Sequence, residues 1–584
     1  MVINKKKNIR QLNITRLILG VVIILLVNII SAFIFTRFDL TAEKRYSLSP
    51  ATKKILKNLK EVVFFKVYLE GDLPPGFRRL SNETREMLDE FRAYSDNIQY
   101  EFVDPSANPN AKDRNDGYRL LMERGLQPAD LRVNKKGQSS QLIIFPAAMV
   151  SHKGNEVPVQ LLMSQLGQDA NLVLNNSIQG LEYNLASAIE KLSTSVKPRI
   201  AFIEGQGELT SLETMDIEKA LSEYYNVDRV TIDHKINSLG IRLKADSTHD
   251  RFVNKYKAII IAKPLKTFDE KDKFLIDQFI MRGGRVLWLV DPVFASMDSL
   301  GKYGATMGIV NEINLEDLLF NYGVRLNTNL VMDMNALQIP VKTGQIGNQP
   351  QFEFFPFYYF PVLTPVIRHP IVNGMNVLKT EFISSLDTVS APGIKKSVLM
   401  TTSPYSRTVN APVFIDLEIL KKQPDERMFS QGPQAVAVLL EGDFTSAYLY
   451  RIPPALSGNP DLDFRGKSKP TKMIITGDGD MIKNQFQVSK GYALPLGYDQ
   501  WTRQTFGNKE FILNAINYLC DDSGLISVRS RELKLRMLDS TKVANQRLFW
   551  QILNILLPVV LVLGFGLVKF RIRKTVQTRP RRIK

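Results

Sequence analysis

Cysteine and histidine are scarce in this sequence of 584 residues, which contains one cysteine, Cys520, and four histidines. A single cysteine excludes an intramolecular disulfide, and no Cys-x-x-Cys or His-x₃₋₅-His spacing occurs. These absences exclude a disulfide scaffold, a zinc finger and dithiol redox chemistry. We therefore expect no metal site and no cofactor.

The phosphate-binding loop of ATPases is also missing, because no G-x-x-x-x-G-K-[ST] occurs. The nearest match, Gly205-Gln206-Gly207-Glu208, has no lysine and is predicted to be a tight strand-to-helix turn. A hydrolase nucleophile needs a sharp elbow such as G-x-S-x-G or G-x-C-x-G, and neither occurs. Cys520 instead ends a predicted helix. The sequence therefore predicts no catalytic residues.

Basic charge is present in excess, but it is concentrated at the two ends of the chain. Residues 1–16 hold five basic side chains and no acidic one, and residues 569–584 hold eight and no acidic one, so thirteen of the net +17 charges lie there. The body between them is nearly neutral. No basic face wide enough for nucleic acid is implied.

Each basic end adjoins a long apolar run, at residues 17–35 and 548–568, of 19 and 21 residues. Either run is long enough to cross a membrane core of about 30 Å as a helix. The first lacks a small-x-small cleavage site, so we expect an uncleaved signal anchor rather than a removed signal peptide. Because loops rich in Lys and Arg stay cytoplasmic, both termini should lie inside and the body in the periplasm.

Polar residues interrupt both apolar runs, namely Asn28 in the first and Gln551, Asn554 and Pro558 in the second. Polar groups within lipid usually face another helix, so Asn28, Gln551 and Asn554 are candidate contacts with a membrane partner. Single polar defects that the bilayer tolerates are the less favoured alternative.

The body has the pattern of an α/β protein. Residues 36–195 alternate as βαβ, a helix and a β-hairpin, the order of a thioredoxin-like domain, without its redox cysteines. Continuous apolar strands alternate with helices from residue 196, which predicts a doubly wound parallel sheet of an amidotransferase-like kind. The predicted segments are a basic segment 1–16, a transmembrane helix 17–35, a thioredoxin-like domain 36–195, a doubly wound domain 196–330, an irregular β-rich insertion 331–470, completion of that domain and a juxtamembrane segment 471–547, a second transmembrane helix 548–568 and a basic tail 569–584.

Two further features are candidates for a ligand or partner surface. Asp478 and Asp480 follow a predicted strand, where Mg²⁺ or Ca²⁺ could bind, although carboxylates in a Gly turn more often accept hydrogen bonds from their own backbone. With Gly205, Gln206 and Glu208 they make up the candidate surface. Residues 351–361 hold seven aromatics that either cover the sheet or form a docking surface.

Several stretches together resemble a known family, including SIQGLEYNLASAIEKL, KPRIAFIEGQGEL, MRGGRVLWLVDP, IITGDGDMI and GNKEFILNAINYL. They are similar to the ABC-transport auxiliary family, and within it to the gliding-motility-associated GldG group. The resemblance implies a non-enzymatic subunit that works with a multi-spanning ABC permease and a separate cytoplasmic ATPase, and it brings no catalytic residues. A membrane-anchored amidotransferase-like hydrolase and a scaffold of the gliding or secretion machinery remain the alternatives.

The clustering of basic charge outside the two apolar runs yields a test of topology. Alkaline phosphatase fused within residues 200–300 should be active, because the body is expected in the periplasm, and the same enzyme fused at the C-terminus should be inactive. The measurement is phosphatase activity in whole cells at matched fusion levels. The reverse pattern would overturn the predicted topology.

Overall fold

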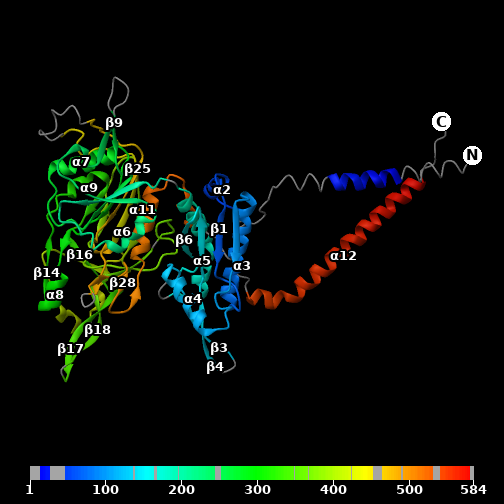
Figure 1. The fold of residues 1–584 in the computed structure, drawn as a ribbon, viewed down its shortest axis with the longest axis horizontal. Helices are drawn as coiled ribbons and strands as arrows, with labels where there is room; N and C mark the ends of the chain where they lie inside the picture. The colour runs from blue at the N-terminus through cyan, green and yellow to red at the C-terminus, as the bar shows by residue number, and fades with distance from the viewer. Residues whose placement is uncertain are drawn as a thin grey trace, which may run out of the picture. The chain divides into compact units, whose positions relative to one another are not determined.

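The structure is a computed structural model in two compact units, one comprising Met1–Arg45 with Glu532–Lys584 and the other Tyr46–Arg531. Figure 1 draws the whole chain. The residues it describes are 14–26, 47–135, 138–163, 168–194, 196–243, 251–347, 349–365, 367–421, 424–451, 463–487, 491–530 and 540–578.

The first unit contains the two apolar runs. Helix α12 (Ser540–Thr578) includes a stretch, Asn545–Ile572, of 28 residues that is long and apolar enough to cross a membrane. At 1.5 Å per residue it spans about 42 Å, more than the membrane core of about 30 Å. Of the first run, the structure describes an apolar helix, Ile14–Leu26. Asn28 lies outside the described residues.

The second unit begins with a small α/β layer built around helix α5. Its helices and strands in chain order are α2 (Pro50–Lys57), β1 (Val63–Val67), α3 (Pro75–Tyr94), β2 (Ile98–Phe102), α4 (Ala111–Glu123), β3 (Ala129–Lys135), β4 (Gln138–Ile144), β5 (Ala147–His152), β6 (Asn155–Gln160) and α5 (Ala170–Ser193).

The sheet of this layer has the order β2-β1-β5-β6, with β1 parallel to β2 and the other pairs antiparallel. Helices α3 and α5 pack against each other and against the sheet. Helix α4 contributes Tyr118, whose ring lies 5.4 Å from that of Phe145. At the start of the layer, the Ser49 side chain accepts a hydrogen bond from the Thr52 N–H and Pro50 is the first helical residue, so Ser49 caps α2.

The chain changes strand partners between β4 and β5. Strand β4 ends at Ile144 and pairs with β3, whereas β5 starts at Ala147 and pairs with β1. Pro146 lies between them, and proline has no N–H to donate to a sheet ladder. The proline therefore lets the chain change partners.

The remaining elements belong to a larger layer. They are β7 (Arg199–Glu204), α6 (Met215–Ser222), β8 (Asn226–Thr231), η1 (Ile236–Ser238), β9 (Gly240–Leu243), β10 (Arg251–Asn254), β11 (Ala258–Ala262), α7 (Glu270–Met281), β12 (Arg285–Leu289), β13 (Val293–Phe294), α8 (Met297–Tyr303), β14 (Ala305–Val310), α9 (Glu316–Tyr322), β15 (Val324–Leu326), β16 (Asn329–Asp333), β17 (Ala336–Ile346), β18 (Gln349–Pro365), β19 (Leu378–Lys379), β20 (Leu386–Thr388), β21 (Ile394–Thr401), β22 (Ser406–Asn410), β23 (Val413–Asp416), η2 (Leu417–Lys421), η3 (Glu426–Met428), β24 (Ala435–Gly442), β25 (Thr471–Thr476), η5 (Asp480–Ile482), β26 (Phe486–Gln487), β27 (Tyr492–Ala493), β28 (Tyr498–Asp499), β29 (Gln504–Thr505), α11 (Asn508–Cys520) and η6 (Leu525–Ser530).

The main sheet of this layer has parallel strands in the order β8-β7-β11-β12-β25. All five residues of β11 are buried, as its continuous apolar sequence predicts for a strand covered on both faces. Helices α6 and α11 contribute to the apolar core on one face, and α7 and α9 to the core on the other. The sheet is therefore covered on both faces by helices.

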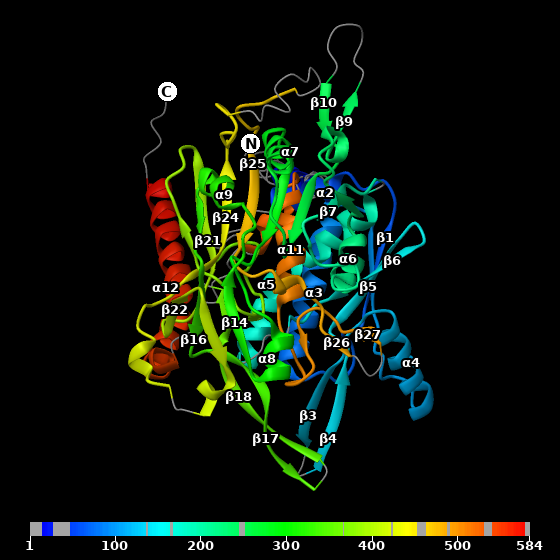
Figure 2. The same cartoon turned by 90° about the vertical axis from the view of Figure 1, so that its left-hand side faces the viewer.

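The segment expected as an irregular insertion in fact extends this sheet. Strands β24, β21, β18 and β17 continue it beyond β25 in antiparallel pairs, and Figure 2 shows β21, β24 and β25 running side by side. The aromatic residues of β18 lie in two different environments. Phe357 to Phe360 are buried in a second apolar cluster, whereas Phe352 and Phe354 are exposed on the hairpin that β18 makes with β17.

After α11 the chain returns to the first layer. Leu525, Ile526 and Val528 of η6 are buried in the same apolar core as Ile178 and Leu185 of α5. Helix α5 therefore supports both ends of the second unit, since α2 also packs on it.

The burial of η6 predicts a measurable loss of stability. Ile526→Ala should lower the free energy of unfolding by about 2–5 kcal/mol, because it leaves a cavity in a packed core. The control is Ile309→Ala, which removes an exposed side chain and should change stability by only about 0.5 kcal/mol. Thermal unfolding of the full chain in detergent measures both. Equal midpoints for the two variants would contradict the packing of η6.

Candidate functional site

The loops that follow β7 and β11 meet at a point where the strand order reverses. Strand β8 lies on one side of β7 and β11 on the other, so the chain leaves β7 and β11 in opposite directions. Ligands of doubly wound sheets commonly bind at such a point, at the carboxyl ends of the strands. A ligand site in this fold is therefore expected at this edge of the sheet.

The loop after β7 turns sharply through two glycines. Gly205 and Gly207 have φ values of 126° and 76°, a backbone conformation that favours glycine. The carbonyl oxygen of Gln206 accepts hydrogen bonds from the N–H groups of Leu265 (2.9 Å) and Lys266 (2.8 Å) in the loop after β11. The two loops are joined by these bonds, which agrees with a tight turn rather than a phosphate-binding loop.

The Glu208 side chain folds back onto the backbone of this turn. Its Oε2 accepts a hydrogen bond of 2.8 Å from the Gln206 N–H, while its buried Oε1 has no hydrogen-bond partner in the part of the chain that the structure describes. Burial raises the pKa of Glu208 to about 7. This carboxyl therefore titrates near neutral pH.

Beside this turn, a lysine and several carboxylates lie together at the ends of β11, β12 and β25. Lys263 Nζ is 3.3 Å from Asp291 Oδ2 and also forms an ion pair with Asp480. The Gly479 N–H donates to Asp291. A Cβ atom at residue 479 would lie 2.6 Å from the Cβ of Lys263, so only glycine fits this approach. The cluster fastens three strand ends to one another.

Asp478 is fully buried in the same cluster. Its Oδ1 accepts from the Asp480 N–H at 2.7 Å and its Oδ2 from the Glu381 N–H at 3.1 Å. Asp478 is thus held by backbone N–H groups, and Asp480 by Lys263.

Burial and mutual repulsion disfavour the charged forms of these carboxyls. Burial raises the pKa of Asp291 to about 6 in spite of Lys263, and it raises the pKa of Asp478 well above its ordinary value. Burial alone would lower the pKa of Lys263, but the attraction of Asp291 and Asp480 outweighs this and raises it. Lys263 is therefore charged at every physiological pH.

A cavity of about 310 Å³ lies at the opposite, amino edge of the sheet. Its walls come from α5, from the segment around Tyr224 and Tyr225, and from the end of α11. Tyr225 donates a hydrogen bond of 2.8 Å to the side chain of Asn517, and Lys257 pairs with Asp522 at 2.7 Å. The cavity thus has both polar and apolar walls and lies between the two layers of the second unit.

Cys520 lines this cavity but is poorly suited to act as a nucleophile. Burial raises the pKa of its thiol to about 12, and the reactive form of cysteine is the thiolate. Burial also raises the pKa of Tyr224 and of Tyr225. At neutral pH these groups are uncharged.

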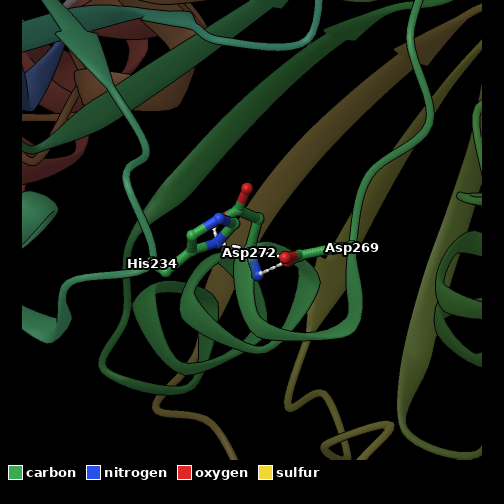
Figure 3. Close-up of side chains that lie close together, drawn as sticks. All are labelled: His234, Asp269 and Asp272. Carbon is green, nitrogen blue, oxygen red and sulfur yellow. Dashed lines mark hydrogen bonds and ion pairs between the residues drawn. The ribbon is translucent and has the colours of Figure 1, made fainter.

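A third cluster lies beside the first loop. His234, which follows β8, approaches Asp269 and Asp272 at the start of α7, and Figure 3 shows its imidazole reaching toward these two side chains. Imidazole and carboxylate groups are metal ligands, so among the described residues these three could hold a metal.

The five residues predicted to form a ligand or partner surface lie at the same edge of the main sheet. Gly205, Gln206, Glu208, Asp478 and Asp480 all lie at the carboxyl edge of the main sheet, although their role in binding stays a prediction. On α12, the side chains of Gln551 and Asn554 are exposed.

Sequence reasoning missed Lys263, Asp291, Glu381 and His234. The available signal was position, since Lys263 directly follows the buried strand β11 and Asp291 comes two residues after β12. Ionisable residues at consecutive strand ends meet at one edge of a parallel sheet.

Comparison with known proteins identifies the family. Residues 197–515, from the start of β7 to within α11, match a family described as ABC-type uncharacterized transport system. The chain belongs to this family. It is thus an auxiliary component of an ABC-type transport system.

The family region contains the main sheet, the charged cluster and the His234 cluster. The first layer matches a separate domain of unknown function (DUF7088) at residues 42–151. An uncharacterized protein of Borreliella burgdorferi is 21% identical over 573 residues, which is 97% of this chain and 98% of that protein. A solved structure, the mmIFT52 N-terminal domain, is 14% identical with a TM-score of 0.30 and covers 55% of this chain and 97% of that one.

The charged cluster predicts that Lys263→Met is destabilising by about 3–5 kcal/mol at pH 8, because it leaves buried carboxylates without a partner. The folded-state pKa of Asp291 is raised, so its protonation adds stability that is lost as pH rises from 3.8 through about 6. Loss of Lys263 removes the charge that lowers the pKa of Asp291, so this pKa rises further in the variant and acidification stabilises the variant more than wild type. The difference in stability between variant and wild type should therefore be smaller at pH 5.

Thermal unfolding at pH 8 and pH 5 measures this gap. Lys302→Met is the control, because Lys302 is exposed and its loss should change stability by only about 0.5 kcal/mol. A gap for Lys263→Met that is constant or wider at pH 5 would contradict this account.

Proposed function

We propose that this chain is a non-enzymatic, membrane-anchored subunit of an ABC transporter of the kind linked to gliding motility. Two helices hold it in the cytoplasmic membrane with both termini inside and the body in the periplasm. A multi-spanning ABC permease is its direct partner, and a cytoplasmic ABC ATPase supplies energy through that permease. A separate ATPase is required because the sequence has no phosphate-binding loop of its own.

The observation that carries this proposal is the attachment of both ends of the body to helix α5. At the front, the Ser49 N–H donates a hydrogen bond of 2.6 Å to Glu182 on α5, and Leu48 is buried. At the back, η6 packs on the same helix. The chain segments that lead to the two predicted anchors therefore start from one rigid element.

Arg529 fastens the rear attachment to the larger layer. Its guanidinium donates to the side chains of Asn514 (2.6 Å) and Glu510 (2.9 Å) on α11. It also lies over the ring of Tyr183 on α5, 5.3 Å from the centroid. A displacement of η6 thus acts on both layers at once.

Helix α5 also forms one wall of the cavity between the layers. Tyr183, Ser187, Glu190 and Lys191 line it from α5, and Leu525 and Ile526 line it from η6. Movement of the membrane helices would then change the cavity, and a molecule bound in the cavity would act on the membrane helices. This is the coupling that a transporter subunit without its own ATPase needs.

We interpret the first layer as thioredoxin-like and the larger layer as amidotransferase-like. The order βαβ, helix, β-hairpin, helix with a β2-β1-β5-β6 sheet supports the first interpretation, and the parallel strands with helices on both faces support the second. Neither brings its usual chemistry, since the sole cysteine is Cys520.

The hydrolase alternative is disfavoured by where Cys520 lies. A nucleophile on an elbow would follow a strand at the carboxyl edge of the sheet. Cys520 instead ends α11 and lines the cavity at the amino edge, with a raised pKa. A scaffold without a transported ligand is the second candidate, favoured by the exposed aromatic hairpin of β17 and β18 as a contact surface.

The test is co-purification in mild detergent. Replacing residues 17–35 and 548–568 with unrelated apolar helices should abolish recovery of an ABC permease, because the membrane contact is removed while both anchors remain. Asn554→Leu should weaken recovery slightly, since hydrogen bonds between membrane helices average about 0.6 kcal/mol. Leu556→Ile is the matched control and should have no effect.

Recovered chains are identified by mass spectrometry at equal levels of the tagged protein. Undiminished recovery of the permease after the helix swap would show that the body makes the contact. Recovery of gliding or secretion components with no ABC permease would favour the scaffold.

A further inference from the structure

The cavity at the amino edge of the main sheet has the size of a pocket for a small ligand. It encloses about 310 Å³, between α5 on one side and the end of α11 on the other. Pockets for small molecules typically enclose about 300–1,000 Å³ and carry a few polar groups that fix the orientation of the ligand. The charged side chains on its walls therefore indicate which kind of ligand fits.

Most of these charged side chains are held by partners within the walls. Lys191 Nζ lies 2.5 Å from Glu223 Oε2, and Lys257 Nζ lies 2.7 Å from Asp522 Oδ2. Asp521 accepts hydrogen bonds of 2.7–3.0 Å from three backbone N–H groups that follow it. These five side chains need no ligand to balance them.

The remaining charge of this group is balanced as well. Arg285 also pairs with Asp522, at 2.7 Å, and adds one positive charge beside the cavity. Asp521 forms no ion pair in the part of the chain that the structure describes, and its negative charge offsets that of Arg285.

Two side chains of opposite charge on the same walls, Glu190 and Lys197, form no ion pair among the described residues. Lys197 Nζ donates one hydrogen bond of 2.8 Å to the Ser222 carbonyl oxygen, and an ammonium group has three donors. Glu190 lies beside the Ser523 hydroxyl, but that hydroxyl donates its single proton to Asp521 at 2.8 Å. Burial raises the pKa of Glu190, as expected of a carboxyl without a counterion.

We propose that this cavity binds a small zwitterion, an amino acid or a dipeptide, whose ammonium group pairs with Glu190 and whose carboxylate pairs with Lys197. Such a ligand brings one charge of each sign, so both side chains gain a partner and no charge in the cavity is left unpaired. A ligand with a single charge would leave either Lys197 or Glu190 without a partner. Tyr224 and Asn517 line the same cavity and offer hydrogen bonds to a peptide group.

The ligand would connect the two layers of the second unit. Glu190 belongs to α5, on which η6 also packs, whereas Lys197 comes two residues before β7 of the larger layer. As the molecule that a transport subunit recognises, this ligand rests on the proposed function, but its binding is measured without a permease. Failure to bind would thus overturn the ligand, and failure to recover a permease would overturn the transport role.

The experiment is calorimetric titration of the full chain in detergent with alanine and with alanylalanine, which differ in the separation of their charged ends. At least one of them should bind saturably, at one molecule per chain. Its N-acetyl form lacks the ammonium group and its C-terminal amide lacks the carboxylate. Each of these forms should bind at least about tenfold more weakly, because hydrogen bonds between charged groups are stronger than those between neutral groups.

Two variants assign the two ends of the ligand. Glu190→Gln should bind the zwitterion and its N-acetyl form equally and still discriminate against the amide, whereas Lys197→Met should show the reverse. Glu312→Gln and Lys302→Met are the matched controls, because both residues are exposed and neither lines the cavity. Circular dichroism verifies that each variant is folded, and the comparison of ligand forms on wild type needs no variant.

Absence of saturable binding of both alanine and alanylalanine would overturn the site. Equal affinity of wild type for the zwitterion and its N-acetyl form would overturn it too, as would a Glu190→Gln variant that discriminates as wild type does. Glycerophosphoethanolamine, the headgroup of a zwitterionic lipid, is the competing probe. Its binding without that of alanine or alanylalanine would assign the cavity to a lipid and overturn the amino acid or dipeptide.

Discussion

Helix α5 packs in the core of the first layer and also lines the cavity toward the larger layer, and the arrangement of the body depends on this double role. Its apolar residues Ile178, Leu185 and Ile189 are buried in the core of the first layer, which also takes in the ends of the body through α2 and η6. Its polar residues Glu190 and Lys191 line the cavity toward the larger layer. Because one helix does both, a change at either end of the body reaches the cavity through packed atoms.

The two edges of the main sheet serve different purposes. At the carboxyl edge, Lys263 and its carboxylates are buried, and buried charges persist only where they are paired and hydrogen-bonded. Such pairing fixes the strand ends and leaves little freedom for a catalytic group. At the amino edge the polar groups surround open volume instead, so under the proposed function a ligand or partner segment would be recognised there.

Local features of this fold could be predicted from the sequence, whereas long-range ones could not. The cap at Ser49 and the burial of strand β11 depend on neighbouring residues, because serine before proline favours a helix start and a continuous apolar run favours a strand covered on both faces. The packing of Ile526 against α5 joins residues more than 300 positions apart, and nothing in the local pattern indicates it. Strands β21 and β24 resembled an insertion because sheet membership is set by hydrogen-bond partners, not by the sequence of the strand itself. His234 was set aside because histidine spacing was considered alone, and its acidic partners lie on another element.

The clusters of ionisable side chains in this chain lie between secondary-structure elements rather than within one element. Each of the clusters described here joins groups from at least two strand ends or helix ends: Lys263 with Asp291 and Asp480, and His234 with Asp269. A group that bridges two elements stabilises one relative position of them. If the membrane helices act on α5, the layers must keep their internal geometry while the cavity between them changes. Fixed charges within the larger layer and an open cavity at its amino edge meet that requirement.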